Sequence, residues 1–407
     1  MKSAAGKPFG TLHEKQTIDS RPAGPKPWYD PRVRSLFFQV VAIALVFWAG
    51  WTLVENTLAN MESRGISTGF GFLDETAGFG IIMSLIPYDA TMTYGRTFWV
   101  GLTNTLLVSA MGIVAATILG FIIGVARLSS NWLVAKVSLV YIEVIRNIPL
   151  LLQIFFWYFA VLGALPSPRQ SIDVGGTMFL NNRGLYVPEP LAQDGFGLVW
   201  GALAIAIAAV VGIRIWAKKR QLATGQIFPT FKVGVALLVL LPAIAYFAAG
   251  SPLEWEVPAL RGFNFGGGIT IIPELAALWV ALSLYTASFI AEIVRSGILS
   301  VSKGQTEAAK ALGLPNGLTL RLVVIPQAMR VIIPPLTSQY LNLAKNSSLA
   351  TAIGYPDLVA VFMGTTLNQT GQAVEVVAIT MAVYLTISLS ISLFMNIYNR
   401  AVAIKER

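Results

Sequence analysis

The chain has 407 residues, of which 55% are hydrophobic and 12% charged, and its mean hydropathy is +0.67. Soluble domains carry about 25% charged residues, so this composition indicates a protein embedded in a bilayer. The chain has no cysteine, which excludes disulfides, and its single histidine, His13, leaves little scope for side-chain catalysis. The net charge of +9 does not indicate nucleic acid binding, because the basic residues are dispersed between apolar runs.

The N-terminal 35 residues are polar and rich in proline, glycine and basic side chains. The first apolar run, 36–54, is long enough to span a ~30 Å hydrocarbon core and longer than the apolar region of a typical signal peptide. We therefore interpret 1–35 as a cytoplasmic tail and 36–96 as an uncleaved first transmembrane helix followed by a periplasmic loop.

Six further apolar runs are each long enough for a helical span. They lie at 100–126, 137–163, 197–216, 231–249, 275–294 and 373–397. An eighth run, 331–353, is interrupted by two prolines and several polar residues, so hydropathy alone does not establish it.

The distribution of positive charge favours eight spans with both termini inside. With this arrangement the internal segments hold 22 of the 29 lysines and arginines, whereas the external segments hold five. Removing the eighth span would place the basic tail, 400–407, outside, against the positive-inside rule.

Two features modify this simple pattern. The segment 132–163 would be about 48 Å long as a helix, so we expect its start to lie along the interface and Pro149 to kink it. The external stretches 164–196 and 251–273 are rich in glycine and proline, and they are either docking surfaces or plain connectors.

The internal loop 299–330 has the pattern of two short helices. Residues 303–312 are good helix formers that end at Gly313 and Pro315, and a second segment, 318–325, is expected to end at Pro326. Small alanines on one face would allow close approach of another protein, although an ordinary amphipathic loop helix fits the same residues.

This loop resembles the EAA loop of ABC importer permeases. Glu307, Ala308 and Ala309 are followed at the family spacing by Gly313 and by the sequence Val323-x-Ile325-Pro326. The family pattern ends I-x-L-P, so this chain differs by two apolar replacements. The resemblance implies that Glu307, Ala308, Ala309, Gly313 and Pro326 belong to an ATPase-coupling loop.

Four other stretches resemble the polar amino-acid branch of these permeases: 101–106, 141–153, 291–295 and 345–349. The extra N-terminal residues and an insert at about 164–265 are similar to the longer general L-amino-acid permeases. The resemblance implies an all-α, polytopic bundle of about eight spans, with a type I, MetI-like permease domain at 97–399.

The family resemblance also implies partners. These are a second homologous permease, expected to form a heterodimer, two ATPase subunits and a periplasmic amino-acid-binding protein. The chain itself is expected in the bacterial inner membrane. The chain lacks the G-x-x-x-x-G-K-[ST] phosphate loop, so we expect no cofactor here and ATP with magnesium on the ATPase. The chain is thus expected to be a transporter subunit and not an enzyme.

Charged residues predicted within or near the spans need a reason, because burying them in lipid is costly. Glu143 with Arg146, and Glu292 with Arg295, are spaced i,i+3 and could pair on one helix. Alternatively they line a substrate pathway, since an amino acid presents charges of both signs. The candidate pathway residues are Glu143, Arg146, Tyr285, Ser288, Glu292, Gln339, Asn342 and Lys345.

Two other classes of function stay open from residues alone. A secondary transporter or channel would need no ATPase, although the halves of this chain show no convincing repeat. An intramembrane enzyme using Ser347 with Lys345 fits the composition only weakly. Abundant glycine in the spans, as at Gly112, Gly120 and Gly124, we attribute to close helix packing.

Overall fold

The computed structural model describes residues 31–63, 65 and 68–402. Most of the expected N-terminal tail, with His13, and the last five residues of the C-terminal tail lie outside the described residues. The chain divides into two compact units, residues 1–68 and 69–407.

The described residues of the first unit form one helix, α1 (Pro31–Ser63). Its apolar part, Val33–Met61, has a hydropathy of 2.0 and exposes apolar side chains on all sides, as a lipid-facing helix does. The predicted span, 36–54, lies inside it, and the helix continues by about two turns beyond the predicted end.

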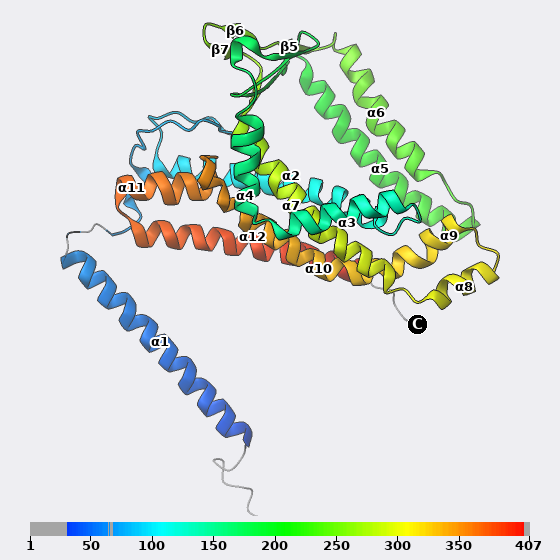
Figure 1. The fold of residues 1–407 in the computed structure, drawn as a ribbon, viewed down its shortest axis with the longest axis horizontal. Helices are drawn as coiled ribbons and strands as arrows, with labels where there is room; N and C mark the ends of the chain where they lie inside the picture. The colour runs from blue at the N-terminus through cyan, green and yellow to red at the C-terminus, as the bar shows by residue number, and fades with distance from the viewer. Residues whose placement is uncertain (1–30, 64, 66–67, 403–407) are drawn as a thin grey trace, which may run out of the picture. The chain divides into compact units, whose positions relative to one another are not determined.

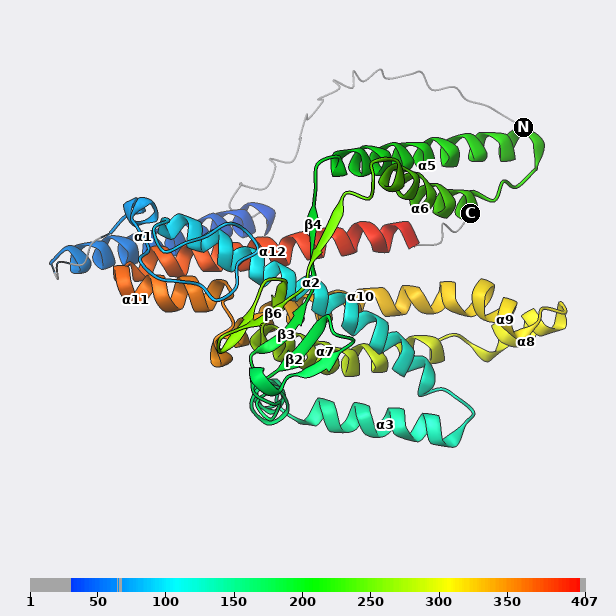
Figure 2. The same ribbon diagram turned by 90° about the horizontal axis from the view of Figure 1, so that it is seen from above.

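Four long helices form the core of the second unit: α2 (Tyr94–Ala126), α7 (Pro273–Leu299), α10 (Ile325–Asn346) and α12 (Ala373–Val402). The central helix is α7, which packs against α2 and α10, and α10 packs in turn against α12 (Figures 1 and 2). Glycines allow this contact, because a Cβ at Gly120 would lie 2.5 Å from Cγ2 of Ile290 and one at Gly124 2.6 Å from the Ala291 carbonyl oxygen. The predicted role of these glycines in packing is confirmed.

A sharp bend separates α3 (Trp132–Asn147) from α4 (Leu150–Phe155) and the π-helix η3 (Phe156–Leu162). The two parts meet at 105° around Pro149, which confirms the predicted kink. Because proline provides no N–H, the side chain of Gln153 donates instead, at 2.9 Å to each of the carbonyls of Ile145 and Ile148. The predicted run 137–163 is therefore not one straight helix but two parts joined at this bend.

The insert consists of a helical hairpin on short antiparallel strands. The hairpin is α5 (Phe196–Thr224) and α6 (Thr230–Ala248). One sheet has the order β1-β2-β3-β8, and the pairs β4–β5 and β6–β7 are separate ribbons. The strands are β1 (Ile172–Val174), β2 (Met178–Asn181), β3 (Gly184–Val187), β4 (Glu189–Ala192), β5 (Leu253–Glu256), β6 (Ala259–Arg261), β7 (Asn264–Gly266) and β8 (Ile269–Ile271).

The segment between α10 and α12 is largely helical. It contains η6 (Ser347–Ile353), the π-helix η7 (Val359–Thr366) and α11 (Leu367–Thr370). Asn104 on α2 donates to the Pro356 carbonyl at 2.9 Å, and Tyr355 donates to the Asn104 carbonyl at 3.0 Å. These bonds fix the turn before η7 against the middle of α2. Two shorter 3-10 turns are η2 (Gly71–Asp74) and η4 (Pro168–Gln170).

Seven helices of the described residues are long and apolar enough to cross a bilayer, and the bent pair α3–α4 brings the number to eight if it counts as one span. The doubtful eighth run lies within the continuous helical stretch Asn316–Ile353, which passes this test. The prediction of a mostly helical protein with about eight spans is confirmed, and the short strands of the insert are an addition to it.

Candidate functional site

The predicted coupling loop forms helix α8 (Lys303–Ala311), at one end of α7 and α10 and away from the strands (Figures 1 and 2). A four-residue helix, α9 (Asn316–Thr319), leads back toward α10. Ala309 is buried against this return segment, whereas Glu307 and Ala308 are exposed. The predicted helix, 303–312, is confirmed to within one residue.

The end of α8 is determined by Gly313, as predicted. Gly313 has a φ of +75°, its N–H donates to the Lys310 carbonyl at 2.9 Å, and the next N–H, of Leu314, donates to the Ala309 carbonyl at 3.1 Å. This pair of bonds is a Schellman motif, which requires the left-handed conformation that glycine adopts without strain. The motif fixes the direction in which the chain leaves α8.

Apolar side chains around α8 are exposed. Leu312 is 81% exposed and Leu322 59% exposed. A loop outside the lipid would be expected to cover such residues unless another protein covers them. Small Ala308, exposed Leu312 and charged Glu307 thus form a knob suited to docking.

The expectation that the second short segment ends at Pro326 is wrong. The π-helix η5 (Leu320–Val324) runs directly into α10, and Pro326 occupies the first turn of that helix. Proline is tolerated there because it has no N–H to donate and follows a π-helical turn, where the backbone hydrogen bonds already depart from the α-helical pattern. Pro326 therefore lies inside a continuous helix.

A polar cleft of about 370 Å³ lies beneath α8, and the sequence analysis did not identify it. Its lining includes Gln305 of α8 and Gln327 and Arg330 of α10, and the two glutamine side chains are 3.4 Å apart. The buried Nε of Arg330 has no hydrogen-bond partner. No residue pattern marks this cleft in the sequence, because its members come from two sides of the loop.

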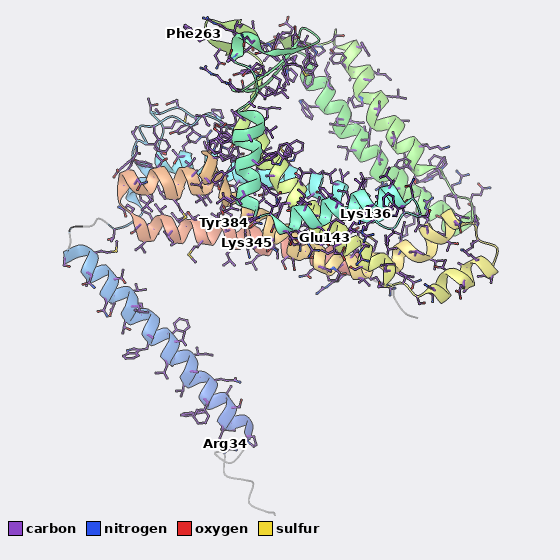
Figure 3. All side chains as sticks on the ribbon, viewed as in Figure 1. Arg34, Lys136, Glu143, Phe263, Lys345 and Tyr384 are labelled. Atoms are coloured by element: carbon purple, nitrogen blue, oxygen red, sulfur yellow. The ribbon has the colours of Figure 1, made fainter. Side chains whose placement is uncertain are left out.

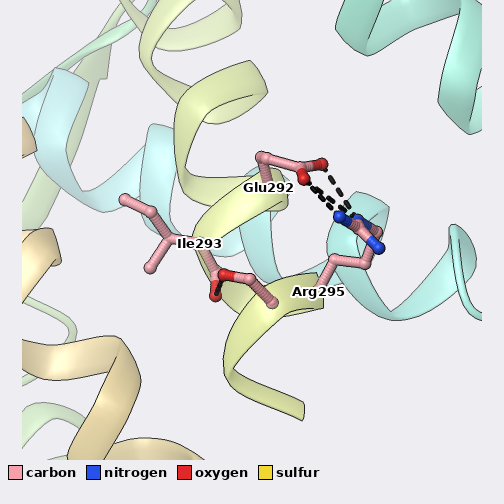
Figure 4. Close-up of polar contacts among 4 residues, drawn as sticks. Glu292, Ile293 and Arg295 are labelled. Atoms are coloured by element: carbon pink, nitrogen blue, oxygen red, sulfur yellow. Dashed lines mark hydrogen bonds and ion pairs between the residues drawn. The ribbon is translucent and has the colours of Figure 1, made fainter. Parts of the chain in front are cut away.

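Among the candidate pathway residues, Glu292 forms an ion pair with Arg295, one turn further along α7 (Figure 4). Arg295 Nη2 lies 2.5 Å from Glu292 Oε1, and Nε also donates to both carboxylate oxygens. The proposed pairing on one helix face is confirmed here. Both side chains keep about a third of their surface exposed.

Glu143 and Arg146 behave differently. Both are exposed on α3, and no ion pair joins them in the part of the chain that the structure describes. The Arg146 guanidinium instead lies 5.0 Å from the ring centroid of Phe289 on α7, a cation–π contact. Their predicted pairing is therefore not formed.

The remaining candidates lie on α7 and α10. The Tyr285 ring lies tilted against that of Phe289, with ring centroids 5.0 Å apart, and Ser288 is fully buried with its hydroxyl donating to the Tyr285 carbonyl. Gln339 is half-buried on α10, and Asn342 and Lys345 are exposed (Figure 3 labels Glu143 and Lys345). The structure thus brings Arg146 of α3 close to the α7 surface that carries Tyr285, Phe289 and Glu292.

One buried polar group that the sequence analysis missed is Asp357, in the turn before η7. Its carboxylate accepts from the Ala360 N–H at 2.8 Å and from the Tyr384 hydroxyl at 3.4 Å. Burial raises the pKa of Asp357 to about 7. The polar residues within 101–106 could have indicated a buried polar partner, because Asn104 and Thr105 form hydrogen bonds with the same turn.

Comparison with known proteins relates the whole chain to importers. The family model for the inner membrane component of binding-protein-dependent transport systems matches residues 219–404. YhdX of Escherichia coli (strain K12), provisionally named an amino-acid ABC transporter permease, is 58% identical over 396 residues, which cover 97% of this chain and 100% of that protein.

Two further relatives cover nearly the same length. The general L-amino acid transport system permease AapQ of Rhizobium johnstonii is 52% identical, over 96% of this chain and 99% of its own. The glutamate/glutamine/aspartate/asparagine permease BztB of Rhodobacter capsulatus is 44% identical, over 93% of this chain and 96% of its own. The matches include the N-terminal helix and the insert.

Proposed function

The chain belongs to the amino-acid ABC importer permeases of the general L-amino-acid type, and from this we propose that α8 is the helix through which its ATPase drives transport. Membership makes the chain a multi-pass membrane subunit and not an enzyme, with ATPase and binding-protein partners. The proposal concerns which residues couple them and how the chain is oriented.

The observation that carries the proposal is the exposed knob on α8. Its exposed Ala308 permits close approach, Leu312 supplies apolar area that the described residues leave uncovered, and the Schellman motif at Gly313 holds the helix at a fixed angle. Closure of an ATPase pair would push on this knob, and α7 and α10, which it joins, would carry the movement into the membrane. Glu307, Ala308 and Leu312 form the contact, while buried Ala309 packs α8 on the return segment and Gly313 fixes the end of the helix. Pro326 lies where the loop enters α10.

We further propose that L-amino acids pass beside α3 and α7. Arg146 and Glu292 offer charges of both signs, and Arg146 and Arg127 lie close enough to act on the Glu292 carboxylate. Tyr285 and Ser288 belong to the same helix surface, and Glu143, Gln339, Asn342 and Lys345 complete the pathway on α3 and α10. The relatives AapQ and BztB are named as permeases for amino acids, which supports this substrate class.

The orientation and assembly follow from charge and family. Placing α8 and both termini in the cytoplasm accounts for the excess of basic residues on that side. The partner permease is a second, homologous chain, so the membrane part is a heterodimer. The core extends over 97–399 with the insert at 164–265.

Replacing Gly313 with valine tests the coupling role. A β-branched residue is strained at a φ of +75°, by roughly 1–2 kcal/mol, and would redirect the chain leaving α8. We expect Gly313→Val to insert normally but to lose ATP-dependent amino-acid uptake in cells lacking the wild-type chain. Gly317→Val is the matched control, because Gly317 has an ordinary φ and open space around it. Full uptake by the Gly313 variant would refute the coupling role of α8.

A further inference from the structure

The turn between α5 and α6 concentrates positive charge. No acidic residue occurs from 195 to 253. Five basic residues lie within this range, at its centre: Arg214, Lys218, Lys219, Arg220 and Lys232. None of the five forms an ion pair in the described chain. The cluster is therefore without a counter-charge from its own hairpin.

The cluster lies on a part of α5 that extends beyond α6. At the opposite end of the hairpin the two helices are level, since a Cβ at Gly195 would lie 3.7 Å from that of Ala249. Gly234 of α6 faces Val210 of α5, at 3.5 Å from an added Cβ. From Val210, α5 continues for about 21 Å to its end at Thr224, whereas α6 covers only about 6 Å between its start at Thr230 and Gly234. The end of α5 therefore extends about 15 Å beyond the start of α6.

The extension is a built surface and not a frayed end. The connecting loop folds back along α5, where the Phe228 ring packs edge-on against Trp216 with centroids 5.3 Å apart. The Arg220 guanidinium lies 5.3 Å from the Trp216 centroid and donates to the side-chain oxygen of Gln226 at 2.7 Å. Gly225, at a φ of +71°, makes the reversal.

Large apolar side chains lie beside these cations, and no part of the chain that the structure describes covers them. Leu222 is 81% exposed, Ile227 80% and Phe231 78%. A surface that combines cations, aromatic rings and exposed aliphatic side chains at the end of a membrane-spanning hairpin matches the boundary between headgroups and acyl chains.

We propose that the α5–α6 turn is a binding site for the phosphate headgroups of anionic phospholipids. Lys218, Lys219 and Arg220 contact the phosphate, while Leu222, Ile227 and Phe231 enter the acyl boundary. A purely topological role for the charges would require no folded turn, whereas the packing of Arg220 and Phe228 on Trp216 holds the cations at one depth.

The test is native mass spectrometry of the full-length chain in detergent, titrated with phosphatidylglycerol or phosphatidylcholine. We expect phosphatidylglycerol to bind at least tenfold more tightly, and raised salt to weaken it, since the contact is electrostatic. The triple variant K218Q/K219Q/R220Q should lose this preference. Two controls should keep it: K218R/K219R, which preserves the charge, and R169Q/R183Q/R261Q, which removes three charges from the strand region.

Three results would overturn the site. Equal binding of the two lipids by the wild-type chain would exclude headgroup recognition even if the triple variant failed to fold. Equal loss in both triple variants would show that only net charge matters. Loss of a co-purifying ATPase from the hairpin variant with its lipid preference unchanged would assign the cluster to a protein partner.

Discussion

Gly101 lies where α2 meets the turn before η7, and there is no room for a side chain. A Cβ at this position would lie 2.9 Å from the Leu358 Cα and 3.2 Å from the Asp357 carbonyl oxygen, both backbone atoms of a turn held by buried hydrogen bonds. A backbone neighbour cannot rotate away as a side chain can.

We therefore expect Gly101→Ala to destabilise the protein by about 1–3 kcal/mol. Thermal unfolding of the purified chain in detergent measures it. Gly201→Ala on α5 is the control, because nothing lies within 4 Å of its added Cβ. A melting temperature as high for Gly101→Ala as for the control would show that the turn does not pack on α2 this closely.

Asp357 makes stability depend on pH. Burial raises the pKa of its carboxyl from the ordinary 3.8 to about 7, so between these values the folded chain binds a proton that the unfolded chain releases. The stability from this proton is complete below about pH 4 and is lost as pH rises to 7.

We expect the melting temperature of the wild-type chain, relative to that of Asp357→Asn, to fall between pH 5 and 7 and to level off above 7. Asparagine cannot titrate but keeps an oxygen to accept from the Ala360 N–H. If the melting temperatures of the two chains changed with pH in the same way across this range, Asp357 would be ionised throughout it.

Among the helices, the sequence correctly predicted the ends and breaks that a single residue determines. Gly313 ends α8 and Pro149 breaks the helix between α3 and α4, because each acts on its own backbone. Pro326 was misjudged because a proline in the first turn of a helix looks the same in sequence as one after its end. Only the continuity of η5 with α10 distinguishes the two.

The strands of the insert could not be predicted from the sequence, for a different reason. Each is three or four residues long, too short for an alternating pattern, and β3 pairs with β8 across the whole hairpin. The polar contacts of the candidate site were equally hidden. Arg146 meets Phe289 only because α3 packs against α7.

The orientation of two elements can be measured directly because the chain contains no cysteine. Leu312 on the α8 knob and Phe263 between β6 and β7 are 81% and 75% exposed. We expect Phe263→Cys to react with a membrane-impermeant maleimide on intact spheroplasts, and Leu312→Cys to react only after permeabilisation. Gly201→Cys, inside the α5 span, should resist labelling in both. The reverse pattern for the first two would place α8 outside.

For the whole molecule, the number of spans followed from charge more than from hydropathy. The stretch Asn316–Ile353 has the lowest hydropathy of the seven unbroken candidates, 1.4, and the count required it only because the basic C-terminal tail needed an even number of crossings. What sequence could not supply is the packing around α7, which depends on contacts between residues far apart in the chain.

We expect this chain to move amino acids only when an ATPase drives it. The most direct measurement is uptake of labelled L-amino acids into proteoliposomes that contain the chain with its partner permease and ATPase, with the binding protein and ATP supplied. We predict uptake from the complete set and none when ATP or the ATPase is left out. Uptake by the chain alone, without ATP, would contradict the account.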